Sequence, residues 1–511
     1  MLSALRTFVR VSLQASGISN EVDPDVRLSF RHRAGSDFVC RLGCLNHAEV
    51  DSILKNLAIN RESCAPIKCT TLHVVKNQTF LHIQLERNAV FSSVLIEVYR
   101  DQIHYGTISP CETSSRYSVD CIPHAFADIT STSLLRINLV RQHVASLLEK
   151  RGYIVAKCPT TLCTEIAQYQ LADIVLKDTD TTACIIEQVD LSPVINIISA
   201  PSRALLQTDF RTSAEDEMFE LLRIRTYTRL RNSCAFVIIL SPDDDASSLS
   251  LDLQGMFDSL KPSCREFYFN HFSSGTAAGL LHPVVCARYN CRFLEAITRH
   301  LWFEKYGYKL INVLASDHVI FYYQIQIILQ IVYYSYDGTV YHQPAVLMIE
   351  PVKYTSGVAE VNVELHVDEL SKIIQTQIKT DTNEHDSREL TTAALSFLLL
   401  GTEIGHLIKI DIKKNILRES GAPFVLYNIA RISAIIKKFT EGPWLSLPAI
   451  FDTDFSLLRE QEEWDLLLRV ILMYPEVVCN ASKSATSFTS SSTHKVVSFL
   501  NMAASLFRYH F

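Results

Sequence analysis

The sequence lacks the short motifs that mark the common catalytic sites. It contains no GxxxxGK[ST] phosphate loop, no GxGxxG turn, no HExxH zinc helix and no GxSxG nucleophile elbow. The glycines of the first two motifs let the backbone approach a phosphate closely, and without them the best sequence evidence for a nucleotide site is missing. We therefore expect a protein that carries no cofactor of its own.

Disulfide and metal frameworks are missing as well. The fourteen cysteines follow no regular spacing, and none of them forms a CxxC pair. No secretory signal follows Met1. This pattern favours free, mostly buried thiols in a reducing compartment, so we predict a cytoplasmic protein without a metal site.

A long uninterrupted hydrophobic run is also absent. The longest apolar stretch, residues 319–336, is interrupted by Gln324, Gln326 and Gln330. Three amides are rare in a membrane span, so the stretch is predicted to be a buried element of a large domain, and no membrane contact is expected.

Charge is small over the whole chain but uneven along it. The chain carries a net charge of −7, which argues against nucleic-acid binding over the whole surface. Its length of 511 residues fits two to four folded domains. Residues 405–439 nevertheless carry a net charge of +5, whereas residues 440–476 carry −6. This contrast indicates one surface that can face RNA and another that faces water or a protein.

A strongly periodic helix is predicted to begin near Phe424. Its apolar residues share one face, and Tyr427, Arg431 and Lys438 fall on the opposite face. An exposed aromatic ring can stack on a splayed base while cations hold phosphates, and Lys413 and Lys414 lie just upstream. The alternative is an ordinary solvated polar face.

The Tyr427-x-x-Ala-Arg431-Ile core of this helix resembles the first helix of the DALR anticodon-binding domain of arginyl-tRNA synthetases. The resemblance implies that Tyr427, Arg431, Lys438, Lys413 and Lys414 face the anticodon side of a tRNA. In that family the domain continues with further helices, whereas here the sequence ends within the helix around Arg508. We therefore expect a shortened domain, or an anticodon pocket that another protein completes.

A second resemblance lies near the N-terminus. Residues 80–106 resemble the end of the N-terminal additional domain of the same synthetases, whose Asn-x-x-Phe-x-Gln cluster contacts the tRNA D-loop. Asn77, Phe80 and His82 match this cluster, with His in place of Gln. The alternative for Phe80 is core packing, because residues 79–85 alternate cleanly as a strand.

The third resemblance concerns the catalytic core. Residues 135–153 resemble the helix that follows the His-x-Gly-His turn of class I synthetases. The four motif positions hold Ser131, Thr132, Ser133 and Leu134, so both histidines and the glycine are replaced. The region of residues 350–357 also lacks the second, lysine-rich signature. We therefore expect no synthetase activity, since those groups stabilise charge on the transferring phosphoryl group.

The resemblance taken as a whole predicts a multidomain α/β plus all-α protein. Residues 1–107 would form a small α+β tRNA-contacting domain, 108–385 a degenerate Rossmann-like synthetase core and 386–511 a helical DALR domain. The sequence is most similar to the family of DALR anticodon-binding domain-containing protein 3, a non-catalytic relative of arginyl-tRNA synthetase.

That family implies a function as a tRNA-binding adaptor. Its members recognise arginine tRNAs and present them to a tRNA methyltransferase that forms 3-methylcytidine in the anticodon loop. Two alternatives stay open, a protein-interaction scaffold without tRNA affinity and a diverged arginyl-tRNA synthetase.

The acidic stretch provides a candidate partner surface. Glu460, Glu462 and Glu463 lie beside Trp464. Clustered acids suit a basic protein surface, and Trp is a common interface anchor. The alternative places Trp464 inside the fold.

Overall fold

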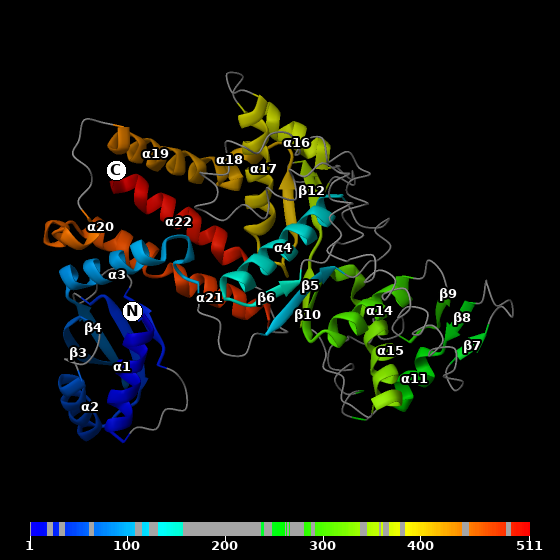
Figure 1. Cartoon of the computed structure of the whole chain (residues 1–511), viewed down its shortest axis with the longest axis horizontal. Helices are drawn as coiled ribbons and strands as arrows, with labels where there is room; N and C mark the ends of the chain where they lie inside the picture. The colour runs from blue at the N-terminus through cyan, green and yellow to red at the C-terminus, as the bar shows by residue number, and fades with distance from the viewer. Residues whose placement is uncertain are drawn as a thin grey trace. The chain divides into compact units, whose positions relative to one another are not determined.

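The computed structural model describes most of the N- and C-terminal parts of the chain and less of its middle (Figure 1). The described residues are 2–17, 24–29, 36–60, 66–107, 115–121, 131–156, 237–239, 248–260, 262, 265, 281–287, 292–337, 345–356, 359–360, 367–378, 384–441, 449–486 and 492–510. These residues form two compact units. The first unit combines residues 1–106, 431–476 and 502–511, and the second combines residues 107–430 and 477–501.

The first unit is built on an antiparallel sheet with strand order β1-β2-β4-β3. Its strands are β1 (Val26–Leu28), β2 (Phe38–Gly43), β3 (Ile67–Val75) and β4 (Gln78–Leu85). Its N-terminal helices are α1 (Leu2–Ala15), α2 (His47–Asn60) and α3 (Arg87–Asp101), with a 3₁₀ turn η3 (Gln102–His104) after α3. Strand β4 alternates in burial, so that one sheet face packs into a core and the other faces outward.

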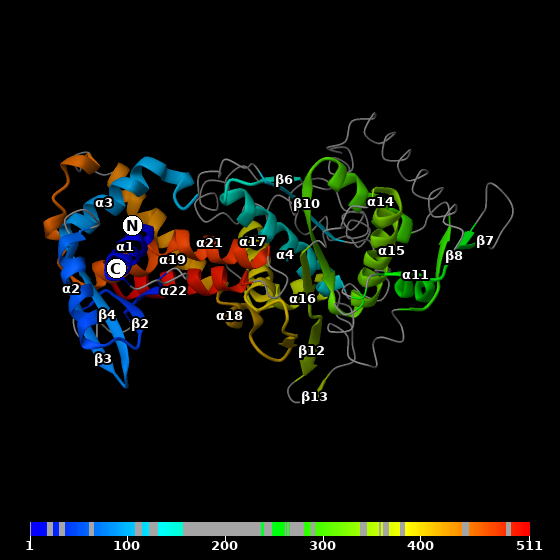
Figure 2. The ribbon, with the colours of Figure 1, turned by 90° about the horizontal axis from the view of Figure 1, so that it is seen from below.

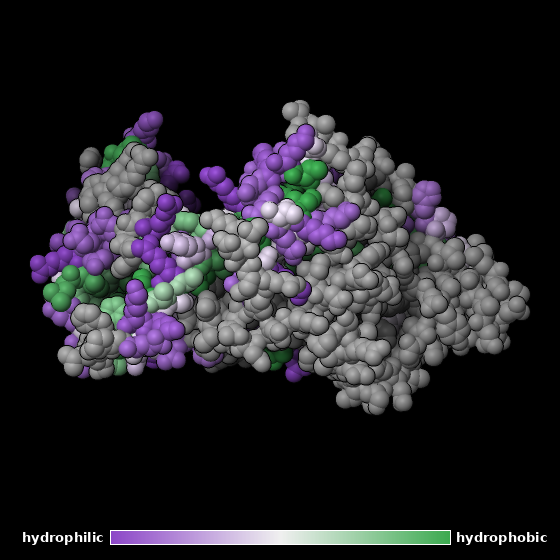
Figure 3. Space-filling view, turned by 90° about the horizontal axis from the view of Figure 1, so that it is seen from above, coloured by the Kyte–Doolittle hydropathy of each residue, from purple (hydrophilic) through white to green (hydrophobic). Residues whose placement is uncertain are grey.

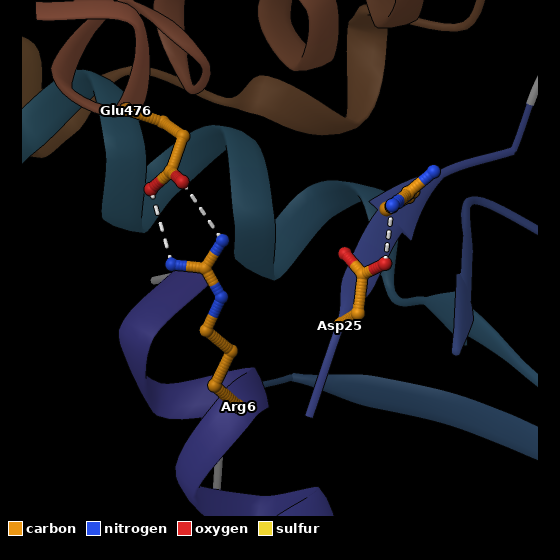
Figure 4. A network of polar contacts seen from close by, with 4 residues as sticks. Arg6, Asp25 and Glu476 are labelled. Carbon is orange, nitrogen blue, oxygen red and sulfur yellow. Dashed lines mark hydrogen bonds and ion pairs between the residues drawn. The ribbon is translucent and has the colours of Figure 1, made fainter. Parts of the chain in front are cut away.

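Helix α1 is amphipathic. Leu5, Val9 and Leu13 lie on its apolar side and are all buried in the core of this unit. Arg6 on the same helix forms a bidentate ion pair with Glu476, in which Nη2 and Nη1 lie 2.9 and 3.1 Å from the two carboxylate oxygens (Figure 4). The apolar side and this ion pair together fix the helix within the first unit.

C-terminal segments complete the core of the first unit. They comprise the 3₁₀ turns η6 (Ile450–Asp452) and η7 (Phe455–Leu457), the helix α20 (Gln461–Leu466) and the short π-helix η8 (Leu467–Ile471). Phe455, Trp464, Leu467, Leu468 and Leu472 share one hydrophobic cluster with residues of α1, α3 and the sheet. Helices α3 and α20 lie side by side in Figures 1 and 2. The division of the chain at residues 107 and 385 stays a prediction, and it differs from these compact units because the acidic segment packs with the N-terminal residues.

The second unit contains a parallel sheet with order β11-β10-β5-β6. Its strands are β5 (Arg116–Cys121), β6 (Ile154–Ala156), β10 (Tyr308–Ala315) and β11 (Ala345–Ile349). Helix α4 (Ser131–Lys150) connects β5 to β6, and α15 (Val319–Asp337) connects β10 to β11. The chain thus leaves β5 and β10 in opposite directions, and such a switch point is where open α/β sheets bind ligands.

Helix α15 contains the longest apolar stretch of the sequence. Ile325, Ile327, Ile328 and Leu329 are fully buried in a cluster that also includes residues of α11 (Leu253–Ser259) and α14 (Arg292–Lys305). The prediction of a buried element is therefore confirmed. Within the described part of the chain, no helix is long and apolar enough to cross a bilayer.

Two smaller sheets belong to the same unit. Strands β7 (Val237–Ile239), β8 (Ser248–Leu251) and β9 (Val284–Ala287) form an antiparallel sheet. Strands β12 (Val352–Ser356), β13 (Ala359–Glu360) and β14 (Ile408–Asp411) form the other, with β12 and β14 parallel. The region expected at the position of the lysine-rich signature therefore contains strand β12.

The remaining elements are helical. They are the 3₁₀ turn η5 (Ser316–His318), α16 (Val367–Thr376), α17 (Glu384–Leu400), α18 (Ile416–Ser420), α19 (Ala422–Glu441), α21 (Tyr474–Ala485) and α22 (His494–His510). Gly421 caps α18 with a φ of 77°, and a Cβ there would meet the side chain of Asn501 at 2.8 Å. This left-handed cap allows α19 to follow α18 immediately. The predicted multidomain α/β architecture with a helical C-terminal part is confirmed.

Candidate functional site

The first turn of α4 contains the residues predicted to stand at the nucleotide-binding turn of a synthetase core. Helix α4 is the next described element after strand β5 and begins at Ser131, whose side chain lies outside the described residues. Thr132, Ser133 and Leu134 are all buried, with Leu134 only 2% exposed. The three side chains therefore face the protein interior rather than a solvent-filled crevice.

Polar groups of this turn bond to strand β12. The Thr132 hydroxyl and the Tyr354 hydroxyl form a hydrogen bond, and the Ser133 Oγ accepts a bond of 3.0 Å from the Val352 N–H. Burying a hydroxyl without a partner is costly, so these bonds hold the turn against β12. Hydroxyls engaged in this way are poorly placed to bind phosphate.

One helical turn further, Arg136 is completely buried. Its guanidinium donates to the backbone carbonyl oxygens of Glu350, His406 and Glu403, the last two at 3.1 and 3.0 Å. Burial lowers the pKa of Arg136 to about 10, and the nearby Glu350 carboxylate partly offsets this effect. The charge thus ties α4 to the residues before β12 and before β14, which is a structural use of a cation.

The outward face of strand β4 presents a different set of groups. Leu81, Ile83 and Leu85 point into the core, whereas Phe80 and His82 lie half-buried on the other face. The alternative of core packing for Phe80 is therefore wrong, because the strand alternation places its ring on the outer face. An aromatic ring on an exposed sheet face is available for stacking.

His82 belongs to a small polar network on this face. Its Nδ1 lies 2.9 Å from the Ser36 Oγ, and its ring meets the His73 ring edge-on at 4.6 Å between centroids. Burial lowers the pKa of His82, and the His73 imidazole lowers it further. The lowered pKa favours a neutral imidazole, which donates one hydrogen bond and accepts another.

Asn77 has a backbone reason for its position. Val75 pairs with Gln78, and the two residues between them, Lys76 and Asn77, have φ values of 49° and 61°. Two positive φ values are typical of a type I′ hairpin turn, in which Asn is favoured. The Asn77 side chain is exposed at the tip of this hairpin, so the turn and an RNA contact are compatible.

Two residues of the outer face were missed by the sequence reasoning. Arg41 on β2 lies opposite Phe80, and its Nε donates to Gln78 Oε1 at 2.9 Å. His73 on β3 also lies opposite Phe80. The two-residue hairpin between β3 and β4 fixes their register, so the position of His73 opposite Phe80 could have been predicted from the sequence. The position of Arg41 could not, because β2 and β4 are distant in the sequence.

Helix α19 carries the predicted aromatic and basic stripe. Tyr427 is 64% exposed, Lys438 is exposed and Arg431 is half-buried. The stripe therefore lies off the buried side of the helix, as expected. The prediction of one continuous apolar core face is wrong in its second half, because Ile436 and Phe439 are each about half exposed.

The basic pair upstream lies in a turn. Lys413 and Lys414 are both exposed between β14 and α18, where Asn415 caps the helix by accepting from the Arg418 N–H. Lys414 also lies 3.5 Å from a Glu419 carboxylate oxygen. An exposed ion pair of this kind is weak, so Lys414 is still available to phosphate.

The prediction that Trp464 anchors a partner protein is wrong. This residue is 1% exposed, its Nε1 donates to Asp37 Oδ1 at 2.8 Å, and its ring packs on Phe91. A side chain that is buried and bonded in this way cannot anchor a partner. Trp464, Leu467 and Leu468 follow one another at helical spacing and are all buried, so they form the inner side of this segment.

The three glutamates of that patch are not equivalent. Glu460 and Glu463 form a capping box at the start of α20, in which Glu463 Oε2 accepts from the Glu460 N–H at 3.0 Å. Glu462 is exposed and takes no part in the capping box. Only Glu462 can therefore be changed without disturbing the helix end.

Among the described residues, no three His, Cys, Asp or Glu side chains are grouped so that they could hold a metal ion.

The fold of the chain is similar to that of solved arginyl-tRNA synthetases. The Thermus thermophilus arginyl-tRNA synthetase superimposes with a TM-score of 0.55 at 15% identity, covering 99% of this chain and 91% of that one. The Plasmodium falciparum enzyme gives 0.53 at 11% identity, with the same coverage. The predicted class I synthetase fold is confirmed.

Two curated relatives are similar in sequence over a shorter stretch. DALR anticodon-binding domain-containing protein 3 of Danio rerio is 25% identical over 116 residues, which is 21% of each chain. The arginine–tRNA ligase of Borreliella burgdorferi is 25% identical over 122 residues, 24% of this chain and 20% of the ligase. The expected resemblance is confirmed, and the match spans about a fifth of either relative. The chain matches no protein-family model.

Proposed function

We propose that this protein binds arginine tRNA without charging it and presents it to a tRNA methyltransferase that forms 3-methylcytidine in the anticodon loop. It would act in the cytoplasm as an adaptor and would hold no cofactor. The names of the relatives, an arginine–tRNA ligase and a DALR anticodon-binding domain protein, support tRNA as the ligand.

The first turn of α4 carries the proposal that the protein is not an enzyme. Class I activation of an amino acid needs donors at this turn that stabilise charge on a phosphoryl group. Here Thr132 and Ser133 are bonded to β12, and Leu134 is buried. A scaffold that has given up this turn can still hold a tRNA through surfaces elsewhere.

Those other surfaces support tRNA binding. The outer sheet face offers an aromatic ring, imidazoles and Arg41, and helix α19 offers Tyr427 with Arg431 and Lys438. Aromatic rings next to cations suit single-stranded loops, in which bases are free to stack. Recognition of this kind does not need a basic net charge over the whole protein.

The aminoacylation assay tests the catalytic half of the proposal. Purified protein with ATP, arginine and tRNA should form no arginyl-tRNA above background. An arginyl-tRNA synthetase assayed in parallel serves as the positive control. Charging that disappears when Thr132 and Ser133 are substituted would establish a diverged synthetase instead.

Sequencing of small RNA bound to the protein tests the binding half. Arginine tRNAs should be enriched over other tRNAs, and an Arg431→Glu/Lys438→Glu variant should lose most of this enrichment. The slope of log tRNA affinity against log salt concentration should become shallower by about one unit for each lost phosphate contact. Unchanged binding with a lower melting temperature would show that these two cations are structural.

The methylation assay tests the adaptor role. The protein alone should not methylate tRNA, but it should raise the activity of a tRNA 3-methylcytidine methyltransferase on arginine tRNAs. A tRNA for another amino acid is the comparison substrate, since its methylation should not respond to the protein. A protein that binds neither tRNA nor methyltransferase would instead fit the scaffold alternative.

A further inference from the structure

An exposed apolar surface lies on the first unit beside the acidic stretch. Tyr99 on α3 is 56% exposed, Phe451 in η6 is 68% exposed and Leu457 in η7 is 72% exposed. The Tyr99 and Phe451 rings meet edge-on, with centroids 6.1 Å apart and an angle of 87° between the planes. We call these three residues the apolar patch.

The patch lies on a segment that is firmly held. Phe455 and Trp464 are buried in the core of the unit, and Asp454 caps η7 by accepting from the Ser456 N–H at 2.9 Å. Arg87 on α3 donates to the Arg459 carbonyl oxygen at 3.1 Å. The large side chains of the patch are thus exposed on an ordered surface, and a preorganised surface loses little entropy on binding.

The chain segment that carries Phe451 and Leu457 is mainly acidic, and the basic Arg100 beside Tyr99 is paired with Asp101 at 2.8 Å. Residues 449–465 contain six acidic side chains and a single basic one, Arg459. Asp452 lies next to Phe451, and Glu462 is exposed at the start of α20. Figure 3 shows hydrophobic residues exposed among hydrophilic ones on one face of the protein. Acidic groups repel a phosphate backbone, so this surface is unsuited to tRNA.

We infer that the apolar patch is a docking surface for a basic segment of a partner protein. Aromatic and aliphatic side chains of the partner would bury Tyr99, Phe451 and Leu457, and its Lys or Arg side chains would meet Asp452 and Glu462. Exposed aromatic side chains within a charged rim are the usual composition of an interface centre. The inference rests on the proposed function in that it takes the methyltransferase to be this partner.

Site-specific cross-linking tests the docking surface in the full chain. A photoreactive benzoylphenylalanine replaces Phe451 in one variant and Ile59 in the control, because Ile59 is similarly exposed, at 65%, on α2 of the same unit. After irradiation in cells, the cross-linked peptide is mapped by mass spectrometry. The expected result is a Lys- or Arg-rich partner peptide from position 451, at a yield at least tenfold above that from position 59.

Charge reversal gives the second arm of the test. Asp452→Lys combined with Glu462→Lys should reduce the yield from position 451 about tenfold, whereas Asp51→Lys on α2 should leave it unchanged. The two chosen acids avoid Asp454, Glu460 and Glu463, which cap helical turns. A yield that does not respond to the reversal would overturn the electrostatic part of the inference.

The outcomes separate the surface from the function. Cross-linking to RNA or to a second copy of the chain, or none above the Ile59 control, would overturn the docking surface. A basic partner peptide that does not come from a methyltransferase would support the surface and refute the adaptor role. Bound arginine tRNA, measured on the same cells, should be equal in the wild type and in the charge-reversed variant.

Discussion

The first turn of α4 and the outer face of the N-terminal sheet use similar polar side chains in opposite ways. At α4, the hydroxyls and the Arg136 guanidinium are buried and bonded to the backbone or to Tyr354. On the sheet, His82 and Arg41 keep at least part of their surface exposed, and the apolar Phe80 ring lies opposite Arg41. A polar group that is bonded inside the fold stabilises the protein, whereas a partly exposed one on the surface can also contact a ligand.

The largest effect is expected from Arg136→Met. The change removes three hydrogen bonds to backbone carbonyl oxygens and should lower the free energy of unfolding by about 3 kcal/mol, at about 1 kcal/mol each. Urea unfolding of the full chain measures the loss. The control is Arg141→Met on the same helix, whose guanidinium donates to the Asn138 side chain one turn earlier. An equal loss in both variants would mean that Arg136 is not a structural tie.

A somewhat smaller effect is expected from Leu134→His, which restores one histidine of the synthetase motif. The site is buried, so the imidazole loses hydration without a partner and should cost about 2 kcal/mol of stability. The aminoacylation assay should still show no charging. Preserved stability together with a gain of ATP binding would show that the turn is still a nucleotide site, and the comparison would fail.

On the sheet, Phe80→Ser should affect binding rather than folding. Loss of a stacking ring costs about 1–3 kcal/mol per base, so tRNA affinity should fall about tenfold while the melting temperature changes little. Fluorescence anisotropy with arginine tRNA measures this affinity. Ile59→Ser, which removes a more exposed apolar side chain from α2, is the control and should bind normally. A large fall in melting temperature would place Phe80 with the structural residues instead.

The smallest effect is expected from the protonation of His82. Its pKa in the folded protein lies below its ordinary value of about 6.5, so the unfolded chain binds the proton more readily. The stability contributed by the neutral imidazole is complete above about pH 6.5 and is lost as the pH falls through the lowered pKa.

Melting temperatures measured between pH 7.5 and 5 check this sign. The wild type should lose slightly more stability than His82→Gln over this range, because Gln keeps a hydrogen-bonding side chain without titrating. His104→Gln, which changes an exposed histidine after α3, serves as the matched control. A wild type that becomes more stable toward acid would contradict the burial of His82.

Strong periodicity made several elements predictable. The amphipathic α1, the buried α15 and the alternating strand β4 all follow from patterns within a single stretch of chain. The exposed position of Tyr427 also followed from helical spacing, since one face of α19 is apolar. Local geometry fixes these features, so the sequence alone was sufficient.

Burial of particular side chains was less predictable. Trp464 fitted a surface patch by its acidic neighbours, yet Asp37 and Phe91, more than 370 positions earlier, bury it. Ile436 and Phe439 fitted a core face, yet they are half exposed, because the second half of α19 is less covered than the first. In both cases the deciding neighbours are distant in sequence, and periodicity contains no information about them.

The sequence by itself determined that residues 131–134 are Ser-Thr-Ser-Leu and that charge changes between residues 405–439 and 440–476. Residue identity and order are sufficient for such statements. Only the tertiary structure decided how residues 132–136 are placed: two hydroxyls bonded to β12, a buried leucine and a guanidinium held by three carbonyls. It also decided which large side chains beside the acids remain exposed. Burial and hydrogen bonding depend on which distant segments pack together, and only the folded chain specifies that.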